Sequence, residues 1–516
     1  MNPALSARVD IAAGRPAVPY SRHVFGHFIE HFHRQVYGGI FEPGSPLADE
    51  RGFRLDVLDA LTELKVPNVR WPGGCFVSAY HWLDGVGPDR VPAYDRAWRV
   101  TEPNTFGTDE FLEWCERLGA EPYICTNAGT GTPEEMGDWL EYCNLPQGSK
   151  WSDRRAGNGR PDPYGVRLWS IGNENYGDWE IGAKSPADWA RFVTESAKIM
   201  RRTDPSVSLL AAAVDDLEWT MPLLASAGKY LDYISIHGYW DRLDSVNSPS
   251  SYLEAMALTL EPEKSIARVE AMIRASGQDV AIAFDEWNLR GWHHPWEPGA
   301  ASIAARDLND DNSTYTMADA LFSATFLNAC LRHASSVKIA NIAPTVNTRG
   351  PLYVHPEGIV KRTTFHVLSM YANLLQDEVL DASVWSRSMN AGATDVPLVD
   401  AIATVGSASG RMSLALVNKS PSDEAVCEIR IDGVPVQGRI AATVLTSDGP
   451  DAYNDVDAPD AVRPREIEIG SGDGSVVLPP HSVAVCHLDR PVAAGAFPDG
   501  WRVSGAGSDW VRTAGS

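Results

Sequence analysis

Two glutamates have the neighbours and the positions needed to cleave a glycosidic bond. Glu174 follows the apolar run 166–171 within Trp169-Ser-Ile-Gly-Asn-Glu-Asn-Tyr-Gly177, and Glu286 follows the apolar run 280–284 and precedes Trp287. A carboxylate at the carboxyl end of a buried strand points into a cleft, and two such carboxylates are the minimum for this hydrolysis. The alternative is that both are solvated loop acids, as most glutamates are. It does not explain why an Asn and an aromatic residue stand beside each one.

The elements around these glutamates alternate between strand and helix about eight times. Amphipathic segments typical of helices cover 53–64, 109–118, 186–202 and 316–333. The alternation predicts an α/β fold, a (β/α)8 TIM barrel over residues 21–375. A doubly wound open sheet is the alternative, but no Gly-rich nucleotide loop follows the first run. The expected strands are Val24–Glu30, Val66–Trp71, Glu121–Asn127, Val166–Gly172, Val207–Ala212, Tyr233–Tyr239, Val280–Phe284 and Val337–Ala343.

The two ends of the chain follow a different pattern. Residues 376–492 contain short strand-like runs divided by Asp/Gly/Pro/Ser turns, which predicts a C-terminal antiparallel β-sandwich of jelly-roll-like form. Residues 1–20 hold one strand-like stretch, Ala7–Ala12, and our hypothesis is that it joins the sandwich. The Gly/Ala/Ser-rich segment 493–516 is expected to be a flexible tail.

The strand ends of such a barrel meet at one mouth, where the substrate binds. Glu174 and Glu286 fall on the fourth and seventh expected strands, so they can face each other across a bound sugar. Retaining hydrolysis needs the two carboxyl groups about 5–5.5 Å apart. The polar residues expected at the mouth are Glu30, Arg70, Asn127, Asn173, Glu174, His237, Tyr239 and Glu286.

The neighbours of the two glutamates suggest different roles for them. Tyr239, if it donates to Glu286, would hold that carboxylate ionised, so we assign Glu286 as nucleophile and Glu174 as acid/base. Asn173 is placed to bond a sugar hydroxyl beside the anomeric centre.

Two further residues are expected to support the site. Arg70, at a strand end, should orient Glu286 or Glu30. Trp287, adjacent to the nucleophile, is the tryptophan most expected to touch substrate.

The chain resembles the α-L-arabinofuranosidases of glycoside hydrolase family 51 over about residues 20–490, with many motifs in the same order. The motifs are Phe25-Gly-His-Phe-Ile-Glu-His31, Tyr37-Gly-Gly-Ile40, Arg70-Trp-Pro-Gly-Gly74, Tyr80-His-Trp-Leu-Asp-Gly-Val-Gly-Pro88, Asn127-Ala-Gly-Thr-Gly-Thr132, Gly172-Asn-Glu-Asn175, Ile234-Ser-Ile-His237 and Asp285-Glu-Trp-Asn288.

The resemblance implies a barrel with a β-sandwich that acts by retention, without a metal or other cofactor. It implies Glu174 as acid/base and Glu286 as nucleophile, with Glu30 and Asn173 on the sugar hydroxyls. It also implies that His237 and Tyr239 line the site. Such enzymes are mostly intracellular in bacteria and often form hexamers, so the resemblance implies a homo-oligomer.

Three positions depart from the commonest family pattern. Cys75 stands where many members place Asn, although Cys also occurs there, and we count it among the substrate-binding residues. Arg290 stands where many members carry an aromatic residue. Thr363 lies in Lys361-Arg-Thr-Thr364, where some members supply a sugar-binding Gln. These positions are expected to shape the pocket wall.

Composition limits the partners and the compartment. The chain has 516 residues, 44 Lys+Arg against 68 Asp+Glu and a formal net charge of -24, with no Lys/Arg-rich run. Nucleic acid and anionic membranes are therefore not expected as partners. Seven scattered cysteines without a CxxC motif predict neither a disulfide framework nor a cysteine zinc site. No signal peptide or membrane-spanning stretch is visible, so a cytoplasmic location is expected.

Other chemistries fit the sequence less well. His23, His27, His31 and His33 lie near Glu30, but their order is not that of a zinc-binding HExxH motif. We therefore expect no catalytic metal.

The leading hypothesis is an exo-acting retaining arabinofuranosidase that removes terminal arabinose from arabinan or arabinoxylan oligosaccharides. The alternatives are the same chemistry on a galactofuranoside, xyloside or β-glucan, motivated by Arg290 and Thr363, a non-catalytic carbohydrate-binding protein, and a metal hydrolase.

Overall fold

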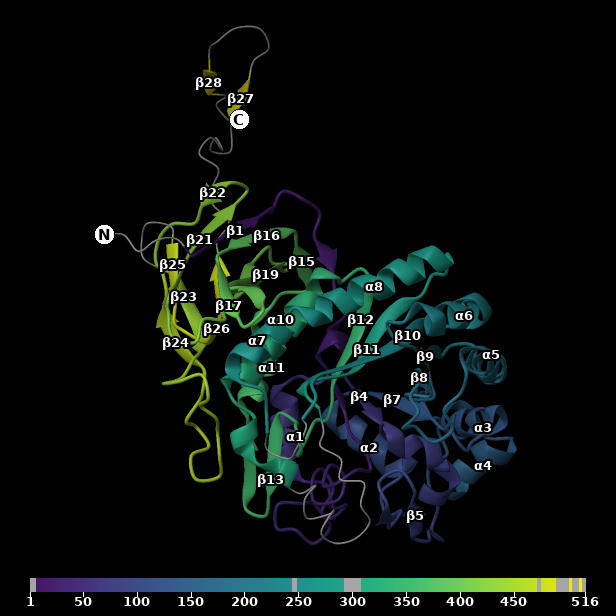
Figure 1. Ribbon diagram of the computed structural model, residues 1–516. Helices are drawn as coiled ribbons and strands as arrows, with labels where there is room; N and C mark the ends of the chain where they lie inside the picture. The colour runs from purple at the N-terminus through teal and green to yellow at the C-terminus, as the bar shows by residue number, and fades with distance from the viewer. Residues whose placement is uncertain are drawn as a thin grey trace.

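Eight parallel strands close into a barrel in the computed structural model, which describes residues 6–243, 248–291, 308–470, 475–488, 501–503 and 510–512 (Figure 1). The order around the barrel is β3-β4-β7-β8-β9-β10-β11-β12, back to β3. Each of the eight expected strands is present, so the predicted TIM barrel is confirmed. The strands are β3 Gly26–Phe28, β4 Asn68–Trp71, β7 Glu121–Thr126, β8 Leu168–Ile171, β9 Ser208–Ala212, β10 Tyr233–Asp241, β11 Ala281–Arg290 and β12 Val337–Ile342.

Helices cover the outside of the barrel, and local signals fix where several of them begin and end. In α5, Pro186 occupies the first turn and the Ser185 side chain accepts a hydrogen bond from the Asp188 amide, which satisfies a free N–H group. Gly119 ends α2 in the left-handed conformation. The helices are α1 Leu55–Glu63, α2 Thr108–Leu118, α3 Pro133–Asn144, α4 Lys150–Gly157, α5 Pro186–Thr203, α6 Leu217–Ala227, α7 Tyr252–Leu258, α8 Glu261–Ser276, α10 Met317–Arg332 and α11 Thr363–Leu374.

Strands β10 and β11 are longer than the sequence predicts. The apolar run that marks β11 ends at Phe284, but the strand continues to Arg290 and stays paired with β10 beyond the apolar part. His237 lies opposite Glu286, and the register shifts on both sides of β11 near this point. Glu286 therefore lies within a strand rather than at its end, and paired backbone holds it.

The lower barrel interior is filled by side chains. Tyr123, Leu168, Leu210, Ala283 and Ile339, from strands β7, β8, β9, β11 and β12, form a small buried cluster. This cluster fills part of the barrel interior, and the polar side chains of the site lie at the carboxyl-terminal end.

Two antiparallel-rich sheets form the predicted β-sandwich beside the barrel (Figure 1). β1 belongs to it, pairing antiparallel with β16 and parallel with β21. Their inner faces enclose a second apolar core. One sheet holds β16 Ala382–Ser386, β1 Ala7–Ile11, β21 Ala425–Ile431, β22 Val434–Pro435 and β25 Ser475–Leu478. The other holds β2 Val18–Pro19, β15 Glu378–Leu380, β19 Val399–Val405, β20 Met412–Asn418, β26 Ser482–Leu488, β23 Ala441–Leu445 and β24 Arg465–Glu468.

Four short two-stranded sheets lie outside these two bodies. Within 493–516, only β27 and β28 are described, and the rest of the expected tail lies outside the described residues. The pairs are β5 Ala93–Asp95 with β6 Val100–Glu102, β13 Leu352–His355 with β14 Gly358–Lys361, β17 Ser388–Ala391 with β18 Thr394–Pro397, and β27 Trp501–Val503 with β28 Trp510–Arg512.

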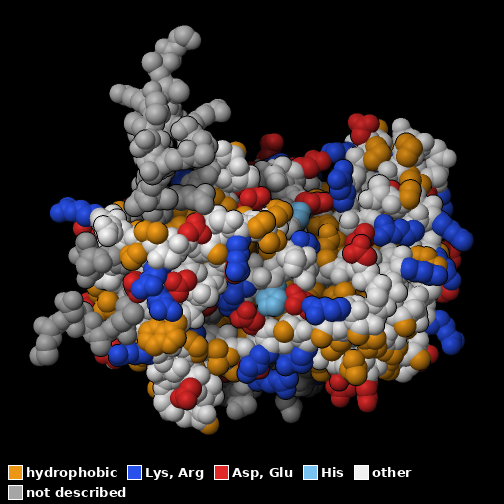
Figure 2. All heavy atoms as spheres, turned by 90° about the horizontal axis from the view of Figure 1, so that it is seen from above, with side chains coloured by type: hydrophobic (Ala, Val, Ile, Leu, Met, Phe, Trp, Pro, Cys, Tyr) orange, Lys and Arg blue, Asp and Glu red, His pale blue; other side chains and the backbone are white. Residues whose placement is uncertain are grey.

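The cysteines are unpaired thiols, and charged side chains of both signs lie on the surface. All seven cysteines are free thiols and six are buried, with Cys75 partly exposed. Acidic and basic side chains are interspersed over the face drawn in Figure 2. Among the described residues, no helix has the length and apolarity to cross a membrane.

Candidate active site

A cavity of about 640 Å³ lies over the carboxyl-terminal ends of the barrel strands. It is lined by seven of the expected site residues, which come from the ends of different strands and the loops after them. These seven are Glu30, Cys75, Asn173, Glu174, His237, Tyr239 and Glu286. The structure thus brings together most of the residues that the sequence predicts for the site.

Glu286 is held from two sides. Its Oε1 accepts from the Arg70 guanidinium, and its Oε2 accepts from the Tyr239 hydroxyl at 2.7 Å. Arg70 is fully buried and also pairs with Asp285 at 3.2 Å through Nε. The irregular register of β11 brings these two successive acids to the same guanidinium. Arg70 therefore orients Glu286, the first of its two expected partners.

Glu174 lies on the loop that follows β8 rather than in a strand. Gly172 turns this loop with a φ of 72°, and a Cβ there would overlap the side chains of Asn175 and Trp189. Glu174 Oε1 accepts from His237 Nδ1 at 2.9 Å, and Oε2 accepts from Trp179 Nε1 at 2.8 Å. Because Trp179 is 53% exposed, one partner of Glu174 faces solvent.

His237 stands between the two carboxylates. One donor atom from each of Glu174, His237 and Glu286 lies within 4.8 Å of the others. Burial alone would lower the pKa of His237, but Glu286, Asp285 and Glu174 outweigh it and raise the pKa to about 10. At neutral pH the imidazole is therefore protonated and neutralises part of the acidic cluster.

The carboxyl groups around His237 respond in the opposite direction. Burial alone would raise the pKa of Glu174, yet its hydrogen bond and charge interaction with His237 lower it overall. Burial also opposes ionisation of Asp285, but Arg70 and His237 lower its pKa to about 2. The resting site thus keeps its proton on the His237 side of the His237–Glu174 hydrogen bond.

Glu30 differs from these acids because it has no cationic partner at hydrogen-bond distance among the described residues. Its Oε1 accepts from the Phe76 amide at 3.0 Å and from Trp98 Nε1 at 3.0 Å. Burial and the nearby Glu286 raise the pKa of Glu30 to about 8. A largely neutral carboxyl at pH 7 can both donate and accept a hydrogen bond, which suits recognition of a sugar hydroxyl.

The side chain of Asn173 is held by Arg70. Its Oδ1 accepts from Arg70 at 2.9 Å, while its Nδ2 is buried, lies near the Glu180 carboxyl and makes no hydrogen bond of standard geometry. A buried, unpaired amide N–H at a cavity wall is costly unless a ligand accepts from it. Its position beside Glu174 therefore suits a sugar hydroxyl.

Two expected site residues lie elsewhere. Asn127 uses its side chain to close its own loop, donating to the Tyr80 carbonyl at 2.9 Å and accepting from the Gly129 and Thr130 amides. Trp287 is buried and stacks on Phe326 of α10 at 4.0 Å between ring centroids. Successive strand side chains alternate, so Trp287 points outward because Glu286 points inward. Neither residue lines the cavity.

Two of the three departures expected to shape the pocket wall, Arg290 and Thr363, are also buried away from it, so the expectation is wrong for these two, whereas Cys75 does line the cavity. Arg290 pairs with Asp319 at 2.9 Å and with Asp241 at 2.6 Å. Thr363 donates to the Thr316 carbonyl at 2.7 Å. Both side chains satisfy buried polar groups near the barrel rim, and neither lines the cavity.

Several residues in or beside the cavity were missed in the sequence. Asp285 adjoins Glu286 and could have been included on that ground alone. Trp98, Gln35 and Arg349 come from loops whose path the strand pattern does not define. Glu180 and Trp179 lie on the same loop as Glu174, and only the loop's fold brings them back to it.

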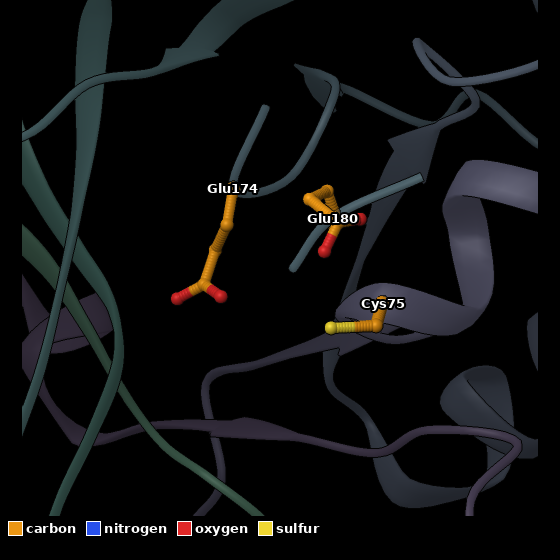
Figure 3. A group of neighbouring side chains, drawn as sticks. All are labelled: Cys75, Glu174 and Glu180. Carbon is orange, nitrogen blue, oxygen red and sulfur yellow. The ribbon is translucent and has the colours of Figure 1, made fainter. Parts of the chain in front are cut away.

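The described residues contain two groups of side chains that could hold a cation. Glu174, His237 and Glu286 form one, and Cys75, Glu174 and Glu180 form the other. Figure 3 shows the second group, in which the loop after β8 supplies both glutamates. Burial and the nearby Glu174 raise the pKa of Glu180 to about 7.

Comparison with known proteins decides the family. Residues 60–257 match the model of the α-L-arabinofuranosidase 1 domain, and residues 285–482 match that of the α-L-arabinofuranosidase C-terminal domain. The chain is 36% identical to α-L-arabinofuranosidase C of Emericella nidulans over 498 residues, which cover 90% of this chain and 93% of that protein.

The chain belongs to the α-L-arabinofuranosidases of glycoside hydrolase family 51.

Other relatives of this family 51 arabinofuranosidase include a bacterial protein and solved structures. It is 36% identical to the intracellular exo-α-(1→5)-L-arabinofuranosidase of Halalkalibacterium halodurans over 79% of this chain and 84% of that one. The Thermotoga maritima enzyme, solved as an arabinose complex, superposes with a TM-score of 0.84 at 33% identity over 94% of this chain and 100% of that one. The Bifidobacterium longum family 51 enzyme gives 0.85 at 31% identity, with the same coverage. The chain is accordingly a hydrolase of arabinose-containing substrates.

Proposed function

We propose that this enzyme is an exo-acting, retaining α-L-arabinofuranosidase that releases terminal arabinose from arabinan- or arabinoxylan-derived oligosaccharides. The observation that carries the proposal is the pair Glu174 and Glu286, whose carboxylate oxygens approach within 4.8 Å but which have different partners. This separation fits the short distance of retaining enzymes and leaves no room for the water that inverting enzymes place between theirs.

In the first step, Glu286 attacks the anomeric carbon while Glu174 protonates the glycosidic oxygen. The bond to the leaving group breaks and an arabinosyl ester forms on Glu286. Arg70 and Tyr239 support this role, because both donate to the Glu286 carboxylate and keep it ionised and aimed.

The proton for the leaving group comes through the His237–Glu174 hydrogen bond. His237 holds it in the resting site, and a glycosidic oxygen near Glu174 draws it across. In the second step Glu174, now ionised, takes a proton from water, whose oxygen attacks the anomeric carbon and frees Glu286, and the proton then passes from Glu174 back to His237. Each carboxylate thus returns to its starting state.

Four further residues complete the site in this proposal. Glu30 and Asn173 bond hydroxyls, His237 holds the acid/base, and Cys75 closes the wall beside Glu174. Arg290 and Thr363 motivated a different sugar, but both are buried outside the cavity, so no observation favours a galactofuranoside, xyloside or β-glucan.

The exo action and the compartment are proposed by analogy. The Halalkalibacterium halodurans relative is named an intracellular exo-acting enzyme, and we propose a cytoplasmic location and exo action for this chain. We also propose a homo-oligomer, as the family resemblance suggests, and light scattering of the purified enzyme tests it.

Proton NMR of the sugar first released from an aryl α-L-arabinofuranoside tests the mechanism. The proposal expects the α-anomer before mutarotation mixes the two forms. First release of the β-anomer would reject retention.

A further inference from the structure

One side of Glu174 faces a thiol and a second carboxyl that the proposed mechanism does not use. Cys75 begins the short 3-10 helix after β4, and Glu180 lies six residues after Glu174 on the loop that follows β8. One donor atom from each of the three side chains lies within 4.8 Å of the others. Figure 3 shows the thiol and the two carboxyl groups around one shared space.

Glu180 is only partly satisfied within this group. The residue is 4% exposed, and its Oε1 accepts from the Ser78 hydroxyl. Its Oε2 is buried and has no hydrogen bond of standard geometry from the described residues, and its nearest donors are the Cys75 thiol and the Asn173 amide, which both act to lower the pKa of this carboxyl. A buried carboxylate oxygen without a donor is costly unless a cation or a proton compensates it. This unpartnered oxygen is a second observation, independent of the grouping, that points to a ligand.

We propose that Cys75, Glu174 and Glu180 form a zinc-binding site, and that zinc bound there inhibits the enzyme by occupying Glu174. Binding itself needs only the three donors, whereas the inhibition rests on the proposed role of Glu174 as acid/base.

The donor set matches the preferences of zinc. Zn²⁺ takes thiolate sulfur at about 2.3 Å and carboxylate oxygen at about 2.0–2.2 Å, with tetrahedral geometry. Tetrahedral donors at those lengths lie roughly 3.3–3.7 Å apart, so side-chain rotations must bring these donors, which lie within 4.8 Å of one another, closer by about 1.5 Å at most. Three protein ligands and one water complete the coordination, and the Cys75 thiol releases its proton to solvent as the thiolate binds.

The neighbouring group of donors is a poorer cation site. The donors of Glu174, His237 and Glu286 also lie within 4.8 Å of one another, but Glu286 already accepts from the Arg70 guanidinium and from Tyr239. A cation there would lie against that guanidinium without a thiolate to offset the repulsion. The Cys75 side of Glu174 is therefore favoured.

Direct binding to the full chain tests the site without any assay of activity. Cobalt(II), used as a coloured substitute for zinc, should give a thiolate-to-metal charge-transfer band at one equivalent, and zinc should remove it. Cys75→Ser should abolish the band. Glu180→Gln should weaken binding at least about 10- to 100-fold, since loss of even an indirect supporting group can cost that much. Glu261→Gln, which removes a half-exposed carboxylate that lines the cavity away from the three donors, is the matched control and should bind like the parent.

Protection of the thiol provides a second readout on the unaltered protein, which covers the case in which a variant does not fold. The other six cysteines are buried, so iodoacetamide should label Cys75 first. Zinc should slow that labelling, measured by mass spectrometry of peptides.

Inhibition of arabinofuranoside hydrolysis is then compared with binding. Zinc should inhibit the parent and Glu261→Gln at the concentration at which it binds, and should inhibit Glu180→Gln at least about tenfold less well. An absent charge-transfer band, equal binding by Glu180→Gln, or unprotected Cys75 would overturn the site. Binding of zinc with full activity would leave the site standing and reject Glu174 as the acid/base.

Discussion

The two carboxylates at the barrel mouth are held in different ways. Glu286 lies inside a paired strand, and its two partners are an interior guanidinium and a tyrosine of the neighbouring strand. Glu174 lies on a loop, and its partners are a histidine that carries a proton and a half-exposed tryptophan. A nucleophile must keep one position and one charge, whereas an acid/base must exchange a proton with its surroundings. The difference in support fits the difference in role.

The largest expected effect distinguishes the roles of Glu286 and Glu174 directly. Glu286→Ala should lower kcat by at least about 10⁴-fold, the scale seen when a nucleophile is removed. Azide should restore turnover of an aryl arabinofuranoside and give the azide of inverted configuration. Glu174→Ala with azide should give the azide of retained configuration instead. NMR of the two products checks the assignment, and the opposite pairing would exchange the two roles.

The next effect depends on the leaving group. Glu174→Gln should slow hydrolysis of arabino-oligosaccharides by about 10²–10⁴-fold, the usual contribution of general acid catalysis. A dinitrophenyl arabinofuranoside, whose leaving group needs no proton, should lose far less in the first step. Pre-steady-state release of the phenol measures this, and equal losses for both substrates would argue against Glu174 as the acid.

Two tyrosines offer a matched comparison of the supports. Tyr239→Phe removes a 2.7 Å hydrogen bond to Glu286, and Tyr176→Phe removes a 3.3 Å one to Glu174. A hydrogen bond to a charged group contributes about 1.5–3 kcal/mol, so Tyr239→Phe should lower kcat/KM by about 10- to 150-fold. Tyr176→Phe should cost clearly less. Steady-state kinetics would contradict the account if the order were reversed.

The barrel could be predicted from the sequence because each strand is a buried apolar run, and the two glutamates could be found because they follow such runs. The extension of β11 to Arg290 could not be found in this way, since it depends on pairing with β10 rather than on apolar residues. Asn127 and Trp287 were expected to bind substrate but do not line the cavity, because position in a motif does not fix the direction of a side chain. The position of Arg290 could not be predicted, because it depends on ion pairs with Asp241 and Asp319, which lie in distant segments of the sequence.

Arg290 supplies a prediction about stability rather than substrate choice. Arg290→Met leaves two buried carboxylates without their cation and should lower the free energy of unfolding by about 3–5 kcal/mol. The ratio of activities on a panel of aryl glycosides should not change in the folded fraction. A changed substrate preference would show that Arg290 does influence the pocket wall.

The smallest expected effect is a pH dependence of stability. The pKa of Glu30 is raised to about 8 from an ordinary value near 4.5, so the folded chain binds the proton more tightly than the unfolded chain. Its contribution to stability is present below about pH 4.5 and is lost as the pH rises toward about 8. Urea unfolding across this range should show a shallower decline in Glu30→Gln than in the parent or in the half-exposed control Glu261→Gln. An unchanged slope would reject the raised pKa.

Trapping the covalent intermediate tests the central claim most directly. In Glu174→Ala, a dinitrophenyl arabinofuranoside should arabinosylate the enzyme faster than water releases the sugar, so the ester should accumulate. Acid quenching followed by peptide mass spectrometry should find one anhydroarabinosyl unit on Glu286. A sugar attached to another residue, or turnover with no adduct and an inverted product, would contradict Glu286 as the nucleophile of a retaining enzyme.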